Sequence, residues 1–322
     1  MTSNLRLISN EFAVVTKIAI LTHVSPDGDC LGSGIALALA LKGLGKEVHV
    51  IIDNPLPGSL AFLPGQELIA VKHSEGFEPE MTFAIDCGDV ERFQDRAVYF
   101  DLANVTVNID HHRTNKGFAT YNYVDCERSS TSELVFELLK EMQVEITKDI
   151  AICLYVGLVT DTGGFKYGNT NAKTHLCAAE LLGYGLNIAA LSQDIFEYST
   201  ESMLRLKAKA LSSLQLEYDK RLAIVTVSKA DFEETVAERS ETEGFADLGR
   251  SIVSVVASVA LREFEKDKIK ISMRSKGTFD VAKIAQLFDG GGHINASGCS
   301  INATLEDAKA QIIKAFEVLK DR

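Results

Sequence analysis

The chain has 322 residues, of which 46% are hydrophobic, and its net charge is −12 at neutral pH. That length is enough to bury two hydrophobic cores and therefore predicts two domains. A protein that grips long nucleic acid through its phosphates normally carries a basic face, and this sequence has no lysine or arginine run of that kind. The composition thus argues against long duplex nucleic acid as a partner and leaves short anionic molecules open.

The N-terminus lacks the basic and then apolar layout of a secretory signal, and no apolar stretch approaches the roughly 18–20 residues of a membrane span. The six cysteines are dispersed and form no C-x-x-C pair, so neither a zinc ribbon nor a disulfide framework is indicated. The sequence therefore predicts a cytoplasmic protein with reduced, mostly buried thiols and no membrane partner.

Apolar runs typical of strands alternate with helical patterns over roughly the first 185 residues. Strands are expected at 18–21, 48–52, 83–85 and 105–109, and helices at 31–44, 132–141, 150–159 and 172–182. Such alternation predicts an α/β fold with a doubly wound parallel sheet.

The rest of the chain has a different pattern. Residues 187–216 form a helical stretch without proline or glycine, which is expected to connect two domains, 1–186 and 217–322. Beyond it, strands are expected at 222–227 and 269–273, and helices at 248–264, 281–287 and 305–319. This mixture predicts a smaller α+β domain, which would close with the first one over a substrate cleft.

Short clusters of His and Asp follow four of the apolar runs. They are His23-Val-Ser-Pro-Asp27-Gly-Asp29, Asp86-Cys-Gly-Asp89, Asp110-His111-His112 and Asp161-Thr-Gly. Each cluster alone is compatible with a turn, a helix cap or a helix stop. Together they would bring carboxylates and imidazoles to one edge of a sheet, where parallel sheets hold their ligands. Two divalent ions about 3.5–4 Å apart need such a set, including a bridging carboxylate, so a two-metal hydrolase is predicted.

These clusters, together with Ser272-Met-Arg274-Ser275 and Gly290-Gly-Gly-His293, resemble the DHH phosphoesterase superfamily and its DHH-associated C-terminal domain. The resemblance spans nearly the whole chain. It is greatest to the nano-RNase A type, which degrades very short oligonucleotides and dephosphorylates 3′-phosphoadenosine 5′-phosphate. The resemblance implies the same activities here.

Three alternatives stay open. A cyclic or linear dinucleotide phosphodiesterase would use the same residues with a differently shaped cleft. A manganese pyrophosphatase or exopolyphosphatase is disfavoured by the glycine cluster and Arg274, because pyrophosphate needs no base-sized pocket. A non-enzymatic nucleotide sensor lacks support because every expected ligand is present.

The resemblance also implies individual roles. One ion would be bound by His23 and Asp27, a second by Asp29, His111 and Asp161, and both by the bridging Asp86. Asp110 would orient its neighbours without binding metal, and His112 would face the substrate as an electrostatic stabiliser or proton donor. Hard oxygen ligands with some imidazole favour two Mn²⁺ ions, for which Mg²⁺ or Co²⁺ could substitute.

Gly28 is expected to allow a sharp turn between two of the carboxylates. Asp89 is expected to be a turn residue, and the segment 129–131 to cap a helix.

In the C-terminal domain, Arg274 offers a planar fork for phosphate, and three successive glycines let backbone N–H groups approach an anion. The structural alternatives are a surface salt bridge and a flexible loop. The implied substrate-binding set is Arg274, Ser275, Gly290, Gly291, Gly292 and His293. The sequence does not rank the nucleotide substrates, and it leaves the oligomeric state open, a homodimer included.

Overall fold

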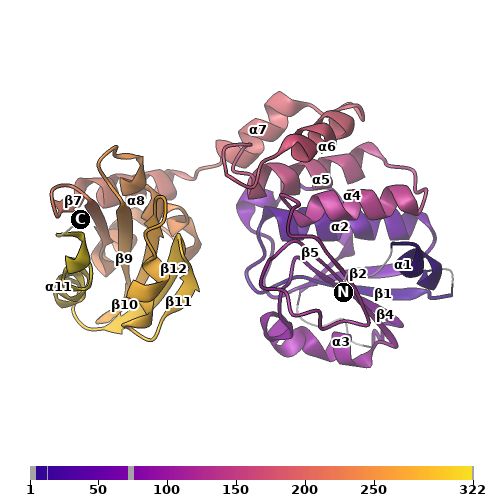
Figure 1. Ribbon diagram of the computed structural model, residues 1–322, viewed down its shortest axis with the longest axis horizontal. Coiled ribbons are helices and arrows are strands. Elements are labelled where there is room, and N and C mark those ends of the chain that lie inside the picture. The colour runs from indigo at the N-terminus through magenta and orange to yellow at the C-terminus, as the bar shows by residue number, and fades with distance from the viewer. Residues whose placement is uncertain (1–4, 13, 72–75, 321–322) are drawn as a thin grey trace. The chain divides into compact units, whose positions relative to one another are not determined.

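A computed structural model describes residues 5–12, 14–71 and 76–320 of the chain. The chain divides into two compact units, Met1–Tyr198 and Ser199–Arg322 (Figure 1). The division falls inside the expected connecting segment, which contains two helices, α7 (Ile188–Phe196) and α8 (Glu201–Ser212). Thr200 caps the N-terminus of α8, because its side chain accepts a hydrogen bond from the Met203 N–H. Because α7 packs on α5 in the first unit and α8 on β8 in the second, the segment is shared between the units.

The first unit contains a parallel sheet with the strand order β3-β2-β1-β4-β5-β6. This confirms the doubly wound sheet. The order reverses between β1 and β4, and ligands of such sheets bind beyond the carboxyl ends of the strands at this point. The short edge strands β3 and β6 lack a buried apolar run and were not expected. The strands are β1 (Lys17–Leu21), β2 (Glu47–Ile52), β3 (Ile69–Val71), β4 (Met81–Ile85), β5 (Val105–Asp110) and β6 (Tyr121–Val124).

Helices cover both faces of this sheet. Successive strand residues point to opposite faces, so that Ile20 joins the larger core and Leu21 the smaller one. The larger core lies under α2, α4 and α5, and α3 covers the other face (Figure 1). The helices of this unit are α1 (Leu5–Glu11), α2 (Gly28–Gly43), α3 (Ala97–Leu102), α4 (Thr131–Glu141), α5 (Lys148–Asp161), α6 (Ala172–Leu182) and α7.

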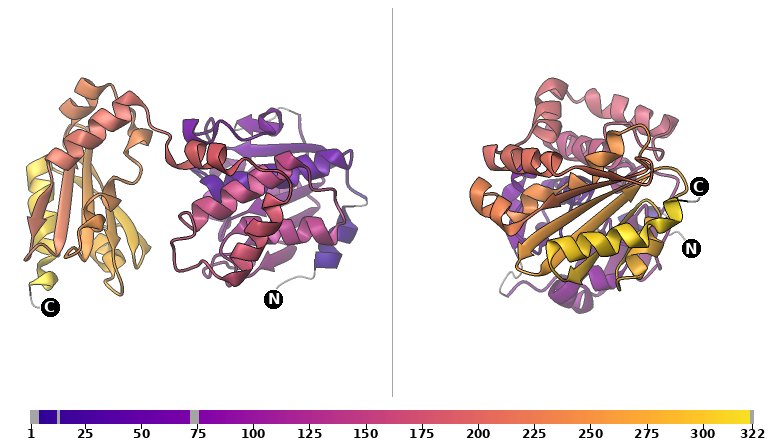
Figure 2. Two further views of the ribbon diagram at one scale, coloured as in Figure 1. Left: turned by 90° about the horizontal axis from the view of Figure 1, so that it is seen from above. Right: turned by 90° about the vertical axis from the view of Figure 1, so that its left-hand side faces the viewer.

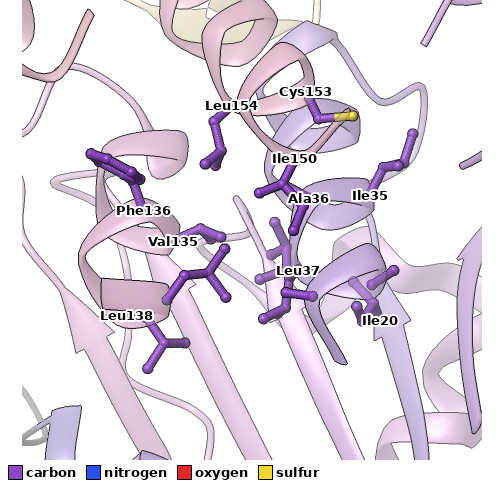
Figure 3. Close-up of a cluster of buried hydrophobic side chains, with 14 of the residues drawn as sticks. Ile20, Ile35, Ala36, Leu37, Val135, Phe136, Leu138, Ile150, Cys153 and Leu154 are labelled. Carbon is purple, nitrogen blue, oxygen red and sulfur yellow. The ribbon is translucent and has the colours of Figure 1, made fainter. Parts of the chain in front are cut away.

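Side chains from α2, α4 and α5 interdigitate in the larger core, among them Leu37, Val135 and Leu154 (Figure 3). Each such buried side chain contributes roughly 1.5–3 kcal/mol to stability. Figure 3 also labels Ile20 of β1 beneath these helices. The core therefore fixes the three helices, and with them their ends, against the sheet.

Glycines bring α2 and α5 unusually close. A Cβ atom on Gly32 would lie 2.4 Å from the Cys153 carbonyl oxygen, and one on Gly28 would lie 2.5 Å from the Thr160 hydroxyl. Gly28 is the first residue of α2, so its small size serves this packing and the expected sharp turn is wrong. The close approach places the start of α2 beside the end of α5.

The second unit contains a mixed sheet with the order β11-β12-β10-β9-β8-β7, in which only the β8–β9 pair is parallel among the described residues. The helix α11 packs across one face of it (Figure 2), and α8 and α9 pack on the other side. This confirms a second, smaller α+β domain. Its elements are β7 (Gln215–Glu217), β8 (Leu222–Val227), α9 (Lys229–Thr235), β9 (Ala257–Glu265), β10 (Lys268–Ser275), α10 (Val281–Gln286), β11 (Gly291–His293), β12 (Ala296–Asn302) and α11 (Leu305–Ala315).

The expected helix at 248–264 is wrong. Its second half is strand β9, and short 3₁₀ turns precede it. Residues 257–261 are all buried because both faces of β9 are covered. A strand of that kind is continuously apolar, and periodicity alone does not separate it from a buried helix. None of the helices in the described parts of the chain has the length and apolarity that a membrane crossing requires.

Candidate metal centre

The four His and Asp clusters meet at the carboxyl ends of β1, β4 and β5. His23 follows β1, Asp86 follows β4, and His111 follows β5. The first turn of α2 and the last residue of α5 bring Asp29 and Asp161 to the same place. The clusters thus meet at one edge of the sheet, as the sequence predicted, and this place is the switch point of the strand order.

Asp86 lies at the middle of the cluster, and its two oxygens face different partners. Oδ2 is 3.7 Å from His23 Nε2, and Oδ1 is 3.6 Å from His111 Nε2. The backbone has φ of +55°, a region that non-glycine residues rarely occupy. Its N–H donates to the Ile109 carbonyl at 2.9 Å, and the Thr131 hydroxyl donates to Oδ1 at 2.9 Å. The neighbouring strand thus holds a strained backbone that aims the carboxylate at two sets of ligands.

Asp29 is 1% exposed, and the N-terminus of α4 binds its carboxylate. The N–H groups of Thr131 and Ser132 donate to it at 2.6 and 3.0 Å. Helix N-termini favour negative charge because their N–H groups lack partners within the helix. Ser130 caps this helix as expected, through the Glu133 N–H. The sequence did not reveal that the free N–H groups of α4 would hold the carboxylate of Asp29, a candidate metal ligand.

Asp161 is the last residue of α5, and the glycine stop that follows keeps it in place. Gly163 and Gly164 have φ of +57° and +69°, and the Gly164 N–H donates back to the Val159 carbonyl at 2.8 Å. Asp161 Oδ2 lies 3.6 Å from His111 Nε2 and accepts from Asn169 Nδ2 at 3.2 Å. The glycines that end helix α5 therefore also fix the position of Asp161, a candidate metal ligand.

Asp27 and His23 complete the other side of the cluster. Asp27 Oδ1 accepts from two N–H groups at the start of α2 and lies 3.9 Å from His23 Nε2. The His23 Nδ1 atom lies 2.9 Å from the Val24 carbonyl oxygen and 3.0 Å from Arg92 Nη2. Since a guanidinium only donates, these two contacts require opposite protonation of Nδ1. A metal on Nε2 requires the bond to Val24, which leaves the Nε2 lone pair free.

His112 is held by the buried Asp110, whose Oδ1 lies 2.6 Å from His112 Nδ1. The other oxygen of Asp110 accepts from Asn115 Nδ2 at 2.6 Å, and Asn115 also donates to Asn108 at 2.7 Å. The hydrogen bond to Asp110 raises the pKa of His112 to about 9. The side chain of His112 is 37% exposed, and its Nδ1 atom also lies 3.6 Å from Asp86 Oδ1.

The carboxylates of the cluster differ in their tendency to ionise. Burial and the negative charges of Asp86 and Asp161 raise the pKa of Asp29 well above its usual value. Burial also raises the pKa of Asp161 to about 6, against the effect of His111. Burial opposes ionisation of Asp86 too, but its three histidine neighbours outweigh this and lower its pKa to about 2. The excess of crowded negative charge favours bound cations.

Among the described residues, three groups of side chains offer ligand atoms that all lie within 4.8 Å of one another. Oxygen and imidazole donors of this kind suit Mn²⁺, Mg²⁺ and similar ions, so the residues fit the expected metals. Cys30 belongs to one group, but it is fully buried and its thiol points to the Ile85 carbonyl. The groups are Asp29-His111-Asp161, Asp86-His111-His112 and His23-Cys30-Asp86.

Arg96 holds the ends of two strands beside the cluster, and no pattern in the sequence indicated this role. The side chain is fully buried, and Nη1 donates to the Thr22 carbonyl at 3.0 Å and the Ile51 carbonyl at 2.9 Å. The Thr22 carbonyl follows β1 directly before His23, and the Ile51 carbonyl lies near the end of the neighbouring strand β2. Arg96 is therefore a positioning residue, and its place in a charged stretch, 91–96, gives no sign of burial.

In the second unit, Arg274 and His293 lie at the same level of the sheet. Both are register partners of Ala296, Arg274 from β10 and His293 from β11. Partners in neighbouring strands point to the same face, so these two side chains flank β12 on one face. The Arg274 side chain is 34% exposed, and its Nε lies 3.8 Å from Asp247 Oδ2.

The remaining expected substrate residues have structural tasks as well. A Cβ on Gly290 would lie 2.3 Å from the Gly298 carbonyl oxygen, and one on Gly292 would lie 2.5 Å from that of Ala296, whereas Gly291 faces open space. Ser275 is 2% exposed, and its hydroxyl donates to the Phe279 carbonyl at 2.6 Å. Substrate contacts of Ser275, Gly290, Gly291 and Gly292 stay predictions.

Comparison with known proteins agrees with this division into two units. Residues 17–158 match the DHH family, N-terminal domain, and residues 219–319 match the DHHA1 domain. The bifunctional oligoribonuclease and PAP phosphatase NrnA of Thermus thermophilus is 34% identical over 94% of this chain and 90% of its own length. The protein of the same name from Bacillus subtilis is 29% identical over 88% and 89%. The crystal structure of an exopolyphosphatase-related protein from Bacteroides fragilis superposes with a TM-score of 0.93 at 32% identity, covering 98% of this chain and 96% of that one.

Proposed function

Because the chain belongs to the DHH family and carries its N-terminal and DHHA1 domains in order, we propose that it is a two-metal phosphohydrolase. Its substrates are very short oligonucleotides and 3′-phosphoadenosine 5′-phosphate, in keeping with the names of its relatives. The observation that carries the proposal is Asp86, whose two oxygens face His23 on one side and His111 on the other. This is what a carboxylate shared by two ions requires.

His23 and Asp27 would hold one Mn²⁺ ion, and Asp29, His111 and Asp161 the other. The short distances from His111 to Asp161 and to Asp86 support this division. Such a pair of ions supplies activated water and offsets the charge of the reacting phosphate. Mg²⁺ or Co²⁺ would fit the same donors.

The protein's own contribution to the reaction is orientation and proton transfer. Asp110 holds His112 by its Nδ1 atom, which leaves Nε2 as the donor toward the substrate. A protonated His112 can stabilise charge on the phosphate or give its proton to the leaving oxygen. The α4 N-terminus keeps the Asp29 carboxylate in position throughout.

Recognition of the nucleotide belongs to the second unit. Arg274 provides a planar fork for a phosphate oxygen pair, and His293 provides a further donor on the same face. The N–H groups around the exposed Gly291 and the buried Ser275, which follows Arg274 in the other motif, complete the proposed set. All six cysteines are free, which fits the reducing cytoplasm.

A panel of substrates tests the proposal. The metal-loaded protein is assayed on 3′-phosphoadenosine 5′-phosphate, a cyclic dinucleotide, pyrophosphate and a graded series from dinucleotide to 24-mer. We expect kcat/KM to be highest at about two to five nucleotides, because a −12 protein offers a longer strand few phosphate contacts. A steady rise with length would indicate a processive exonuclease. Faster hydrolysis of the cyclic dinucleotide or of pyrophosphate would favour those alternatives.

A further inference from the structure

Within the described residues, Arg262 of β9 has no carboxylate in ion-pair distance, unlike Arg239, Arg250 and Arg274 of the same unit. Its Nη1 donates to the Thr242 hydroxyl at 3.1 Å, and its Nη2 donates to the Ser272 hydroxyl. By contrast, Arg239 pairs with Glu265, and Arg250 pairs with Asp247 at 2.8 Å. Hydroxyl groups are neutral, so Arg262 keeps an uncompensated positive charge.

That charge is largely removed from water. The guanidinium of Arg262 packs on the Phe264 ring at 5.8 Å, and its Nε atom is buried without a hydrogen-bond partner. Two of its five N–H donors contact hydroxyl groups. A buried charge without a counter-ion opposes folding, and proteins keep such groups mainly where function needs them.

The position of Arg262 links it to the motif expected to bind substrate. Residues 258, 260 and 262 of β9 share a face with residues 270, 272 and 274 of β10. Arg262 is the register partner of Lys270, and its guanidinium reaches along the strand to Ser272, toward Arg274. The acidic side chains that follow it are used elsewhere. Glu263 binds backbone N–H groups at 229 and 267, and Glu265 pairs with Arg239 and Lys268.

We propose that Arg262 acts with Arg274 as a receptor for a second phosphate of the substrate, distinct from the phosphate that is hydrolysed. The proposal rests on the proposed function and deepens it. In 3′-phosphoadenosine 5′-phosphate the second group is the 5′-phosphate, and in a short oligonucleotide it is a non-reacting phosphate. Two arginines without full neutralisation attract a dianion, and the guanidinium fork matches phosphate oxygens. Arg262 thus determines specificity for substrates with two separated phosphates.

The experiment compares two substrates that differ in this group alone. Values of kcat/KM are measured for 3′-phosphoadenosine 5′-phosphate and for adenosine 3′-phosphate, which lacks the 5′-phosphate. We expect Arg262→Gln to lower the first value about 10- to 100-fold and the second less than about twofold. Arg262→Lys, which keeps the charge without the fork, should fall between the wild type and Arg262→Gln. The matched control is Arg239→Gln, because Arg239 lies 5.0 Å from the same Phe264 ring but is paired with Glu265. This control should change neither value by more than about twofold.

A binding measurement separates this inference from the proposed function. The dissociation constant of adenosine 5′-phosphate is measured by calorimetry, with adenosine for comparison, and melting temperatures check folding. Weaker binding of the phosphorylated probe to Arg262→Gln supports the receptor even if the wild type hydrolyses neither nucleotide, which would refute the proposed function alone. An equal loss on both substrates with a lower melting temperature would mean that Arg262 is structural. Unchanged binding and unchanged kcat/KM would overturn the proposal as well.

Discussion

The functional surfaces of the two units carry opposite excess charge. In the first unit, Asp29 and Asp161 are crowded around Asp86, and burial and mutual repulsion raise the pKa values of Asp29 and Asp161. In the second unit, Arg262 has no acidic partner among the residues that the structure describes, and the Arg274 Nε is 3.8 Å from Asp247 Oδ2. Under the proposed function, the first surface would need cations before it could accept a phosphate, whereas the second would attract phosphate directly. The contrast leads us to propose metal binding and chemistry for one unit and recognition for the other, and substitutions in each unit test this proposal.

The largest effect is expected from the shared carboxylate. Asp86→Ala should cost at least about a thousandfold in rate because both proposed ions lose a ligand. Asp89→Ala should keep most activity, since Asp89 caps the 3₁₀ segment Val90–Arg96 and pairs with Lys116. Initial rates and manganese content are measured for both variants. Equal losses at the two positions would contradict the assigned roles.

His112→Gln should lower kcat by about 100-fold or more while both metals stay bound, because the variant loses a proton donor held by Asp110. A nucleotide 4-nitrophenyl ester distinguishes the two possible tasks of this histidine, since its leaving group needs no proton. The loss should shrink on the ester if His112 is the acid. A loss of the same size on both substrates would show that His112 only stabilises charge on the phosphate.

Arg274→Ala should weaken nucleotide hydrolysis by about 1.5–3 kcal/mol through loss of a charged hydrogen bond. Metal content measured by elemental analysis should stay at the wild-type value, because Arg274 belongs to the other unit. Asp161→Asn is the matched control that should lose metal. If manganese disappears from the Arg274 variant as well, the separation between the two units fails.

The comparison of the units also explains what the sequence could predict. The candidate ligands of the first unit could be selected from the sequence because buried parallel strands leave continuous apolar runs, and His23, Asp86 and His111 follow these runs closely. In the second unit the same kind of run was misleading, since β9 is covered on both faces and resembles a buried helix. Strand β11 is too short and too rich in glycine to give any strand pattern.

The residues that support the metal ligands could not be found from the sequence. Arg96 stands in a charged stretch, yet it folds inward to bind the carbonyls at 22 and 51. Thr131 was predicted only as part of a helix cap and Ser132 only as the first residue of the following helix, and their contact with Asp29 spans more than a hundred residues. Such contacts depend on how α2 and α4 pack, which no local pattern encodes.

The smallest effect concerns stability without metal, which should depend on pH through the carboxylates of the first unit. The pKa of Asp161 is about 6 in the folded protein, compared with 3.8 for an ordinary aspartate. Between these values the folded state holds more protons than the unfolded state, so metal-free stability falls as pH rises from about 4 to 6, by at most about 3 kcal/mol for this group. Asp86 acts in the opposite direction but below this window, since its pKa is about 2 and its contribution is lost only as pH falls below about 4.

Bound Mn²⁺ would neutralise the ionised carboxylates and remove their mutual repulsion. Added Mn²⁺ should therefore raise the melting temperature by several degrees more at pH 7 than at pH 5. Asp161→Asn should flatten the metal-free pH dependence between pH 4 and 6, whereas Asp101→Asn, at an exposed position of α3, should leave it unchanged. Calorimetric scans with and without metal at the two pH values measure both effects. An equal rise in melting temperature at pH 5 and pH 7 would mean that these carboxylates do not repel one another in the folded protein. The proposed contrast between an acidic metal centre and a basic phosphate-binding surface would then depend on the second unit alone.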